Sequence, residues 1–385
     1  MSDTSQAVAA PQSPAVETTL AAHLRSGHPA LQLVSFQGAL TPQAFAGAPS
    51  ELAALTQSAA IYDLGYRAFL EVTGGDQLRW LNGMVTNAIQ SLEAGHWNYN
   101  LLLNAQGRIQ GDANIYRFPN RLLFQTDRSQ IARLTAHLDH FIIMDDVALQ
   151  ELDASSVAVG IAGPASERIL SSLGLSIPAE NTFIPAKLDA VDITLVRAHS
   201  PIVPRFEIWA PVVSLPQTWS ALAAAGATPA GLDALEALRI LEATPLYGVD
   251  IQERYLAQET AQMRALNFNK GCYLGQEIVE RIRSRATVHR GLRQFSLTGK
   301  PQPLPPGETI PLTAEGAERN PVGDLSSIAH YQLSDFTGTL ALGMIRIDVL
   351  ERKLSIAYAG GEATPLDAPP PISIPQIEIS QIQGQ

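Results

Sequence analysis

The only cysteine of the chain, Cys272, lies in the stretch NKGCYLGQE at residues 269–277. A thiol reacts as its thiolate, which nearby positive charge or the amides of a helix N-terminus stabilise. Lys270 lies two residues before the thiol, and the stretch QEIVERI, which begins at Gln276, predicts a helix whose N-terminus would face it. These neighbours favour a reactive thiol, whereas a lone cysteine is more often a packed core residue.

Two glycines, Gly271 and Gly275, permit a tight loop around Cys272, which a buried structural cysteine does not require. One cysteine cannot form an internal disulfide, so the thiol is free and fits a reducing compartment. Four thiolates normally hold an iron–sulfur cluster, so the chain cannot enclose one alone. The residues themselves leave open whether Cys272 reacts or packs.

Two carboxylates lie in strand-like segments. Asp112 follows a glycine turn at Gly107 in NAQGRIQGDANIY. In a cleft it could hydrogen-bond the N–H edge of a heterocycle or the amine of a one-carbon carrier, and the alternative is an ordinary turn aspartate. Glu207 in RFEIWA alternates with Phe206 and Ile208, so it faces the opposite side of its strand. That side is solvent by default, and a cavity is the alternative.

A basic run surrounds and follows the cysteine. It consists of Lys270, Arg281, Arg283, Arg285, Arg290 and Arg293. Six positive charges minus the two negative charges of Glu277 and Glu280 leave a local charge of +4. Such a run is usually a solvated face. The functional alternative is a site between Arg281 and Arg293 for an anionic ligand, such as a polyglutamate tail, a phosphate, an RNA backbone or an acidic partner.

Metal and nucleotide motifs are scarce. His137 and His140 lie three residues apart in HLDH, but no third ligand accompanies them at a suitable spacing, so we predict no metal site. The sequence has no phosphate-binding loop, no GxSxG elbow and no GxGxxG fingerprint.

Composition describes an ordinary globular protein. The chain has 385 residues, of which 46% are hydrophobic and 16% charged, enough for two or three folding units. A net charge of −11 and a pI near 5.2 argue against stable nucleic-acid binding and against attraction to an anionic membrane. Neither a membrane-spanning run nor a signal or transit peptide is recognisable, so we predict a cytoplasmic protein that binds no membrane.

Helices and short strands interleave without a repeated βαβ period, which predicts an α+β fold. Apolar spacing of three and four predicts helices over 75–92, 129–142, 164–174 and 232–243. Short β-rich runs predict strands over 68–74, 121–126, 147–153, 157–163 and 206–211. Past residue 290 only strands are expected, over 291–299, 323–332, 338–348 and 352–360, and they predict a small antiparallel β-barrel.

The domain boundaries follow from composition. We expect a largely disordered tail over 1–30, the α+β domain over 31–290, the barrel over 291–365 and a flexible tail over 366–385. The alternating isoleucines of the last segment could instead dock as an edge strand.

Several segments resemble the glycine-cleavage T-protein family in their order and spacing, from about residue 31 to 360. They include AAIYDLGYRAFLEVTG with the stretch that follows it, IAGPAS, and ALRILEATPLYGVDI. NFNKGCYLGQEIVERI matches the Lys-Gly-Cys-Tyr/Phe-x-Gly-Gln-Glu signature of the YgfZ-type folate-binding branch, whose members support iron–sulfur enzymes.

This resemblance implies a T-protein-like folate-binding domain of two α/β subdomains, closed on one side by a C-terminal antiparallel β-barrel. Tetrahydrofolate or a derivative would occupy the cleft. Asp112 stands where the family has the acid that faces the reactive nitrogens of folate, and Glu207 matches a glutamate that contacts the pterin. Tyr99, Gly271 and Gln276 are further expected folate contacts.

The resemblance also makes Lys270 and Cys272 a signature pair with an expected catalytic role. The leading hypothesis is a folate-binding accessory protein for the biogenesis or repair of iron–sulfur clusters, including those of tRNA methylthiotransferases. Its partners would be cluster assembly or client proteins, and Cys272 would ligate iron transiently or exchange sulfur.

Two alternatives remain. One is a T-protein-like aminomethyltransferase that passes a one-carbon unit to tetrahydrofolate, and the other is a scaffold with a vestigial folate site. T-proteins usually carry Lys-x-Asp-Phe in place of Lys-Gly-Cys-Tyr, and an arginine where Leu235 stands here. The glutamate of RILEA is displaced by one position, to Glu242, which puts that contact in doubt.

Overall fold

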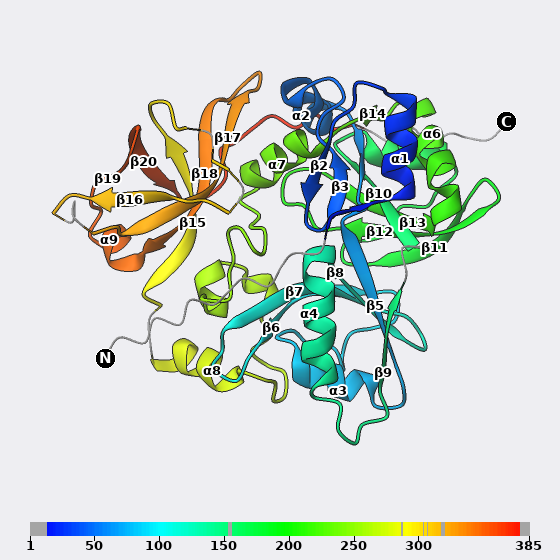
Figure 1. Ribbon diagram of the computed structural model, residues 1–385, viewed down its shortest axis with the longest axis horizontal. Coiled ribbons are helices and arrows are strands. Elements are labelled where there is room, and N and C mark those ends of the chain that lie inside the picture. The colour runs from blue at the N-terminus through cyan, green and yellow to red at the C-terminus, as the bar shows by residue number, and fades with distance from the viewer. Residues whose placement is uncertain are drawn as a thin grey trace.

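The computed structural model describes residues 14–152, 156–285, 288–302, 304–305, 307–316 and 320–377. Two α/β units lie together, and a β-barrel flanks them at one side (Figure 1). The expected α+β fold with a C-terminal antiparallel barrel is confirmed. No helix in these ranges has the length and apolar character needed to cross a bilayer.

The first unit is built on a six-stranded sheet. Its strands in spatial order are β11 (Phe183–Leu188), β12 (Val191–Ala198), β13 (Arg205–Pro211), β10 (Ser156–Ala162), β4 (Ala60–Asp63) and β14 (Thr228–Pro229). One face packs against α1 (Thr19–Gly27), α5 (Ser166–Ser172), η1 (Val212–Ser214) and α6 (Leu215–Ala224). The other face, which carries Tyr62 and Trp209, belongs to the central core of the molecule.

The second unit is a five-stranded antiparallel sheet. Its spatial order is β6 (Trp97–Leu103), β7 (Ile109–Arg117), β8 (Leu122–Asp127), β5 (Arg67–Thr73) and β9 (Ala148–Leu152). Helices α3 (Gln77–Met84) and α4 (Arg128–Asp139) cover one face. On the other face, Tyr116 and Phe69 meet Trp209 of the first sheet at ring distances of 4.6 and 5.0 Å. The two sheets therefore face each other across aromatic side chains.

The N-terminal region contains more structure than expected. A small sheet of β1 (Val16–Glu17), β3 (Ala39–Pro42) and β2 (Leu33–Phe36) precedes α2 (Ala48–Gln57). Helix α1 begins at the cap residue Thr18, whose side chain accepts a hydrogen bond from the amide of Ala21. The tail expected over 1–30 is therefore wrong from Val16 onward, because Leu20 and Leu24 bury an apolar face. Residues 1–13 lie outside the described ranges.

A closed barrel of six strands forms the C-terminal unit. The strand order is β15 (Arg290–Leu297), β18 (Thr337–Arg346), β17 (Gly323–Gln332), β16 (Ile310–Ala314), β19 (Ile356–Tyr358) and β20 (Gly361–Leu366), with α9 (Ile347–Glu351) after β18. The sequence patterns anticipated four of these strands and missed β16 and β20, which are short and interrupted by proline. Between α7 (Leu232–Leu241) and the barrel, the chain forms η2 (Ala257–Thr260), η3 (Met263–Ala265) and α8 (Gln276–Arg285).

Helix α3 ends earlier than the apolar spacing predicts. It stops at Met84, whereas a helix was expected to run to residue 92. The side-chain oxygen of Asn82 accepts the amides of Ile89 at 2.9 Å and Gln90 at 3.3 Å, which folds the following segment back on the helix. The side chain of Asn82 thus binds backbone amides that would otherwise donate within a longer helix, and the helix ends.

A buried ionic network joins the barrel to the body. Arg239 of α7 donates to Oδ2 of Asp250 at 2.6 Å and to Oγ of Ser327 at 2.9 Å. Oδ1 of Asp250 accepts from the hydroxyls of Ser326 at 2.5 Å and Ser327 at 2.7 Å, both on β17. Asp250 is 2% exposed, so these bonds are shielded from water and fix β17 against α7.

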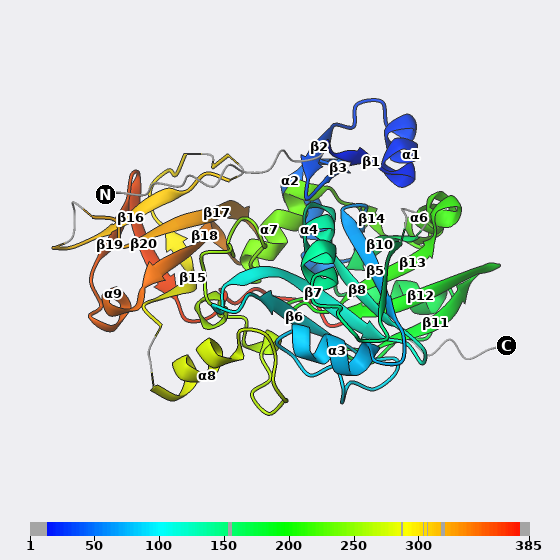
Figure 2. The ribbon, with the colours of Figure 1, turned by 60° about the horizontal axis from the view of Figure 1, so that its bottom comes forward.

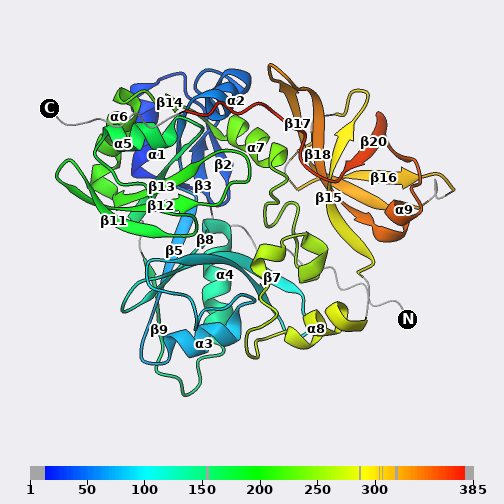
Figure 3. The same cartoon turned by 180° about the vertical axis from the view of Figure 1, so that it is seen from behind.

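The segment after β20 returns from the barrel to the body, past α2 (Figure 3). Ile372 and Ile374 pack on the central core, and Ile377 packs on the core of the six-stranded sheet. The backbone of Ser373 accepts from the Gln57 amide at 2.9 Å and donates to Asp335 at 2.5 Å. The flexible tail expected from residue 366 is therefore wrong up to 377; the segment docks without forming a strand, and residues 378–385 are not described.

Candidate functional site

A cavity of about 810 Å³ opens beside the junction of the two sheets. Its walls come from β6, from the loop between β12 and β13, and from η3. The lining residues include Asn87, Trp97, Tyr99, Arg197, His199, Arg205 and Arg264. The volume is typical of cavities that take a drug-sized ligand.

Tyr99 and Asp112 meet next to this cavity. The Tyr99 hydroxyl donates to Oδ2 of Asp112 at 2.8 Å, and the Gln130 amide donates to Oδ1 at 2.9 Å. Burial, and then the charge of Asp112, raise the pKa of Tyr99 well above its usual value, so the phenol remains a donor. Asp112 is thus a half-buried, oriented carboxylate rather than a turn residue.

Glu207 faces the interior between the sheets. It is 5% exposed, and its Oε2 accepts from the Gln125 amide at 2.7 Å and the Trp209 indole at 2.8 Å. The predicted alternation with Phe206 and Ile208 is confirmed, but the default expectation of a solvent-facing side is wrong, because the second sheet covers it. No described residue donates to its other oxygen, Oε1.

Arg67 is the half-buried cation that offsets these carboxylates. It donates to Oδ1 of Asp127 at 2.7 Å. Burial opposes its charge, but the carboxylates of Asp127, Glu207 and Asp112, together with Tyr66, raise its pKa overall. Burial also opposes the charge of Asp127 and raises its pKa to about 6, although the charge of Arg67 lowers it. The interior therefore holds three carboxylates around one guanidinium.

Arg264 covers Tyr99 from the cavity side. Its guanidinium lies 4.1 Å from the centre of the Tyr99 ring, within the range of a cation–π contact. Arg264 forms no ion pair with a carboxylate of the described residues. The Asn87 amide donates to the backbone carbonyls of Arg264 at 2.9 Å and Tyr99 at 3.2 Å, and so holds both residues together.

The opposite wall carries His199, Ser200 and Arg205. Arg205 lies 3.3 Å from Oε2 of Glu242, and Ser200 donates to Oε1 of the same side chain. Glu242 is 4% exposed, so despite its displaced position in RILEA it supports this wall. Burial, followed by the charges of Arg264 and Arg205, lowers the pKa of His199 to about 4. The imidazole is therefore neutral at pH 7.

Lys270 fixes the loop that carries the thiol. Its ammonium donates to the carbonyls of Asn82 at 2.6 Å, Val85 at 2.6 Å and Asn87 at 2.7 Å. Burial lowers its pKa, but three carbonyl oxygens favour the charged form. All three protons are thus used by the backbone, and a catalytic role with Cys272 stays a prediction.

Cys272 itself is exposed, so it is not a core residue. Gly271 is also exposed, and a Cβ there would meet open space. Gly275 has a φ of +81°, and a Cβ there would approach the Asn104 carbonyl to 2.6 Å, so this position requires glycine. The Gln276 side chain accepts from the Tyr273 amide at 3.2 Å and closes the turn into α8. Neither Gly271 nor Gln276 lines the cavity.

The basic run divides between two elements. On α8, Arg281 is exposed, and Arg283 lies 3.5 Å from Glu280 and over the Phe268 ring. Arg290, on β15, pairs with Glu259 at 3.0 Å. The side chain of Arg285 lies outside the described residues. A single anion site formed by the whole run stays a prediction.

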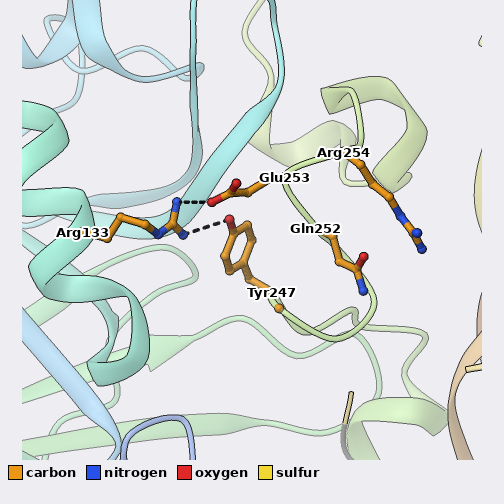
Figure 4. Close-up of a pocket in the computed structure, with 6 residues that line it drawn as sticks. Arg133, Tyr247, Gln252, Glu253 and Arg254 are labelled. Carbon is orange, nitrogen blue, oxygen red and sulfur yellow. Dashed lines mark hydrogen bonds and ion pairs between the residues drawn. The ribbon is translucent and has the colours of Figure 1, made fainter. Parts of the chain in front are cut away.

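A second, smaller cavity of about 360 Å³ lies between α4 and the loop of residues 247–254 (Figure 4). Arg133 crosses it to Glu253 at 2.8 Å and to the Tyr247 hydroxyl at 2.9 Å. Its cation is therefore already neutralised. Within the described ranges, no group of three or more His, Cys, Asp or Glu side chains could hold a metal ion.

Sequence reasoning missed Arg67, Asn87, His199 and Arg264 as residues of this site. Arg67 precedes a predicted strand, and the other three lie on loops or a short 3₁₀ turn, where no periodicity marks the inward-facing positions. One available signal was Arg264, an isolated basic residue a few positions before the signature segment.

Comparisons with known proteins agree with this architecture. An aminomethyltransferase from Deinococcus deserti is 29% identical over 232 residues, which cover 59% of this chain and 64% of that protein. One from Chlorobium chlorochromatii is 28% identical over 73% of this chain and 78% of that protein. The structure of glycine cleavage system aminomethyltransferase T from Bartonella henselae superposes with a TM-score of 0.79, over 90% of this chain and 95% of that one, at 18% identity. This last likeness shows a shared fold.

The GCVT N-terminal domain family matches residues 29–270, a stretch that contains both sheets, the Tyr99–Asp112 pair and Lys270. Since this match covers well over half of the chain, the protein belongs to the GCVT N-terminal domain family.

Proposed function

We propose that this chain binds a reduced folate in the cavity beside Tyr99 and handles a one-carbon unit there. The observation that carries the proposal is the Asp112 carboxylate, oriented by Tyr99 and Gln130 next to the cavity. Asp112 does not itself line the cavity, but Tyr99 does, and through this contact the carboxylate can stabilise positive charge that develops on a bound folate or take part in proton exchange with it.

The charges of the cavity suit a folate. Arg197 and Arg205 are paired with Glu167 and Glu242, whereas Arg264 has no carboxylate partner among the described residues. Arg264 is therefore the cation best placed to bind a carboxylate of the glutamate tail. Glu207 is buried between the sheets and does not line this cavity, so its contact with a pterin stays a prediction.

Calorimetric titration with folinic acid, an air-stable reduced folate, tests the proposal. We expect saturable binding, weakened about tenfold in Arg264→Gln, a loss of about 1.4 kcal/mol. The control Arg352→Gln, an exposed residue after α9 on the barrel, should bind like the wild type. Absence of saturable binding to the wild-type protein would overturn the proposal.

The chemistry that the relatives support best is aminomethyl transfer. The named relatives are aminomethyltransferases, and the fold matches one of them over nearly its whole length. With an aminomethyl-lipoyl carrier and tetrahydrofolate, we expect folate-dependent release of ammonia. Asp112→Asn should slow it about a hundredfold, as loss of a group that handles protons does. No ammonia release by the wild-type protein would reject this chemistry.

A second candidate is an accessory role in iron–sulfur cluster biogenesis or repair, supported by the exposure of Cys272 within its KGCYLGQE segment. Deletion of the gene should then lower the activity of cluster-dependent enzymes. A Cys272→Ala copy should fail to restore it, while that variant still binds folinic acid. Full restoration by the variant would reject a role of the thiol.

A further inference from the structure

We propose that Lys270 and Asn87 are positioning residues that couple the cavity to the loop of Cys272, so that a ligand in the cavity changes the reactivity of the thiol. The identity of the ligand rests on the proposed function, whereas the coupling rests on contacts within the chain.

Lys270 caps the C-terminal end of α3. The helix ends at Met84, so the carbonyls near its end lack helical partners. The ammonium occupies this position and donates to Asn82, Val85 and Asn87, where a positive charge also complements the helix dipole. The loop that carries the thiol is thereby tied to one helix end.

A second contact ties the other side of the loop to the same place. The amide of Leu274 donates to the Gly83 carbonyl at 3.0 Å. Tyr273 is 8% exposed, and its ring lies 4.8 Å from the ammonium of Lys270. Only Gly271 and Cys272 remain exposed between the two attachment points, and the loop lies between α3 and α8 (Figure 2). The position of the thiol therefore follows the end of α3.

Asn87 connects this end to the cavity. Its backbone carbonyl accepts from Lys270, while its side-chain amide donates to the carbonyls of Arg264 and Tyr99. Asn87, Arg264 and Tyr99 all line the cavity. Thr86 reinforces the path, because its hydroxyl donates to the Ala265 carbonyl at 2.7 Å.

The path has a direct consequence for ligand binding. A ligand that displaces Arg264 from the Tyr99 ring moves the backbone that Asn87 holds, and Lys270 transmits this movement to the thiol loop. Such coupling requires that the ligand bind with different affinities when Arg264 is stacked on the Tyr99 ring and when it is displaced. Because Arg264 stacks on the ring within the cavity, a ligand there can favour the displaced arrangement.

Alkylation of the thiol tests the coupling, because Cys272 is the only cysteine and a thiol reagent therefore reacts in this loop alone. The rate with iodoacetamide is measured with and without saturating folinic acid. We expect folinic acid to change the wild-type rate about fivefold or more, the lower end of typical coupling. In Lys270→Met the ratio should fall close to one, and Lys270→Arg should restore part of it. The exposed control Lys300→Met should keep the wild-type ratio.

A second arm needs no ligand. Arg264→Ala should change the alkylation rate of the unliganded protein. This effect should vanish when Asn87→Ala is also present, because Asn87→Ala removes the side-chain bond to Arg264 but keeps the backbone carbonyl that binds Lys270. This measurement without ligand still tests the coupling if Lys270→Met fails to fold or if folinic acid does not bind. Failure of folinic acid to bind would count against the proposed function alone. An unchanged rate in Arg264→Ala, or an equal ligand ratio in wild type and a folded Lys270→Met, would overturn the coupling.

Discussion

The hydroxyl of Tyr99 on β6 donates a 2.8 Å hydrogen bond to the carboxylate of Asp112 on β7, two positions along from its cross-strand neighbour. Tyr99→Phe removes this donor and leaves Oδ2 of Asp112 without a described partner. We expect a loss of about 1–2 kcal/mol in the free energy of unfolding and about tenfold weaker binding of folinic acid. Urea unfolding and calorimetry measure the two effects.

The matched control is Tyr358→Phe. Tyr358 donates to the Thr298 carbonyl at 2.6 Å within the barrel, so this variant loses a similar hydrogen bond far from the cavity. It should bind folinic acid with wild-type affinity. Equal weakening in both variants would contradict a specific role of Tyr99.

The junction between barrel and body should depend on Asp250. Asp250→Ala leaves the buried Arg239 with Glu236 as its remaining carboxylate partner among the described residues, and it removes the acceptor of two serines. We expect a loss of about 3–5 kcal/mol in the free energy of unfolding. Asp348→Ala, which removes an exposed ion pair with Arg346, should leave the urea midpoint unchanged. A small effect of Asp250→Ala would show that the network does not hold the barrel.

The stability of the protein should fall as pH rises through the titration of Asp63. This carboxyl is 2% exposed, accepts one bond from the Gly65 amide and has a second oxygen with no described partner. Burial raises its pKa to about 7, against the effects of Gly65 and Arg128. The folded state therefore holds a proton that the unfolded state has released above about pH 4.

From about pH 5.5 to about pH 8, this group should cost the wild type about 2 kcal/mol of stability. Asp63→Asn lacks the titration, so the difference between the variant and the wild type should shift by that amount in favour of the variant. Urea unfolding at both pH values measures it. A difference that does not vary with pH would show that Asp63 is ionised in the folded protein throughout.

His199 should report on an anionic ligand. Its pKa lies near 4, because burial and the charges of Arg264 and Arg205 disfavour the protonated ring. A ligand carboxylate in the same cavity offsets those charges, so the pKa should rise when folinic acid binds. NMR titration of the imidazole, assigned with His199→Asn, measures the change. An unchanged pKa in the saturated protein would place the carboxylates of the ligand elsewhere.

The segment after β20 should stabilise the assembled molecule. Ile372→Ser together with Ile374→Ser replaces two half-buried apolar side chains, which pack on the central core, with small polar ones. We expect a loss of about 1–3 kcal/mol in the free energy of unfolding. Ser373→Ala keeps the backbone bonds of the segment and loses only an exposed side-chain bond to Asp335, so it should unfold almost like the wild type. Wild-type stability of the double variant would show that the segment only rests on the surface.

Much of the fold was predictable from local patterns. The alternation of RFEIWA correctly put Glu207 opposite Phe206 and Ile208, because a strand has a strict period of two. The residues alone did not reveal that a second sheet covers Glu207, because the contact with Gln125 joins positions 82 residues apart. Periodicity gives the face of a strand, whereas tertiary packing determines what that face meets.

The roles of the signature residues were less predictable. Lys270 lies two residues from Cys272 in the sequence, yet its ammonium reaches carbonyls more than 180 residues earlier in the chain. Helix α3 ends at Met84 because of such tertiary contacts and because of Asn82, so apolar spacing alone extends it too far. The roles of Arg264 and His199 were not predictable, because only the folded chain brings the two residues to the cavity beside the sheets.

The docked segment after β20 also has a consequence for the order of folding. The contact between Gln57 and Ser373 spans 316 residues, and closing so long a loop is entropically costly before both partners are formed. We therefore expect refolding to complete this contact after the sheets and the barrel have formed. A protease added early in refolding should cut the chain between β20 and Ile377 while it spares the barrel.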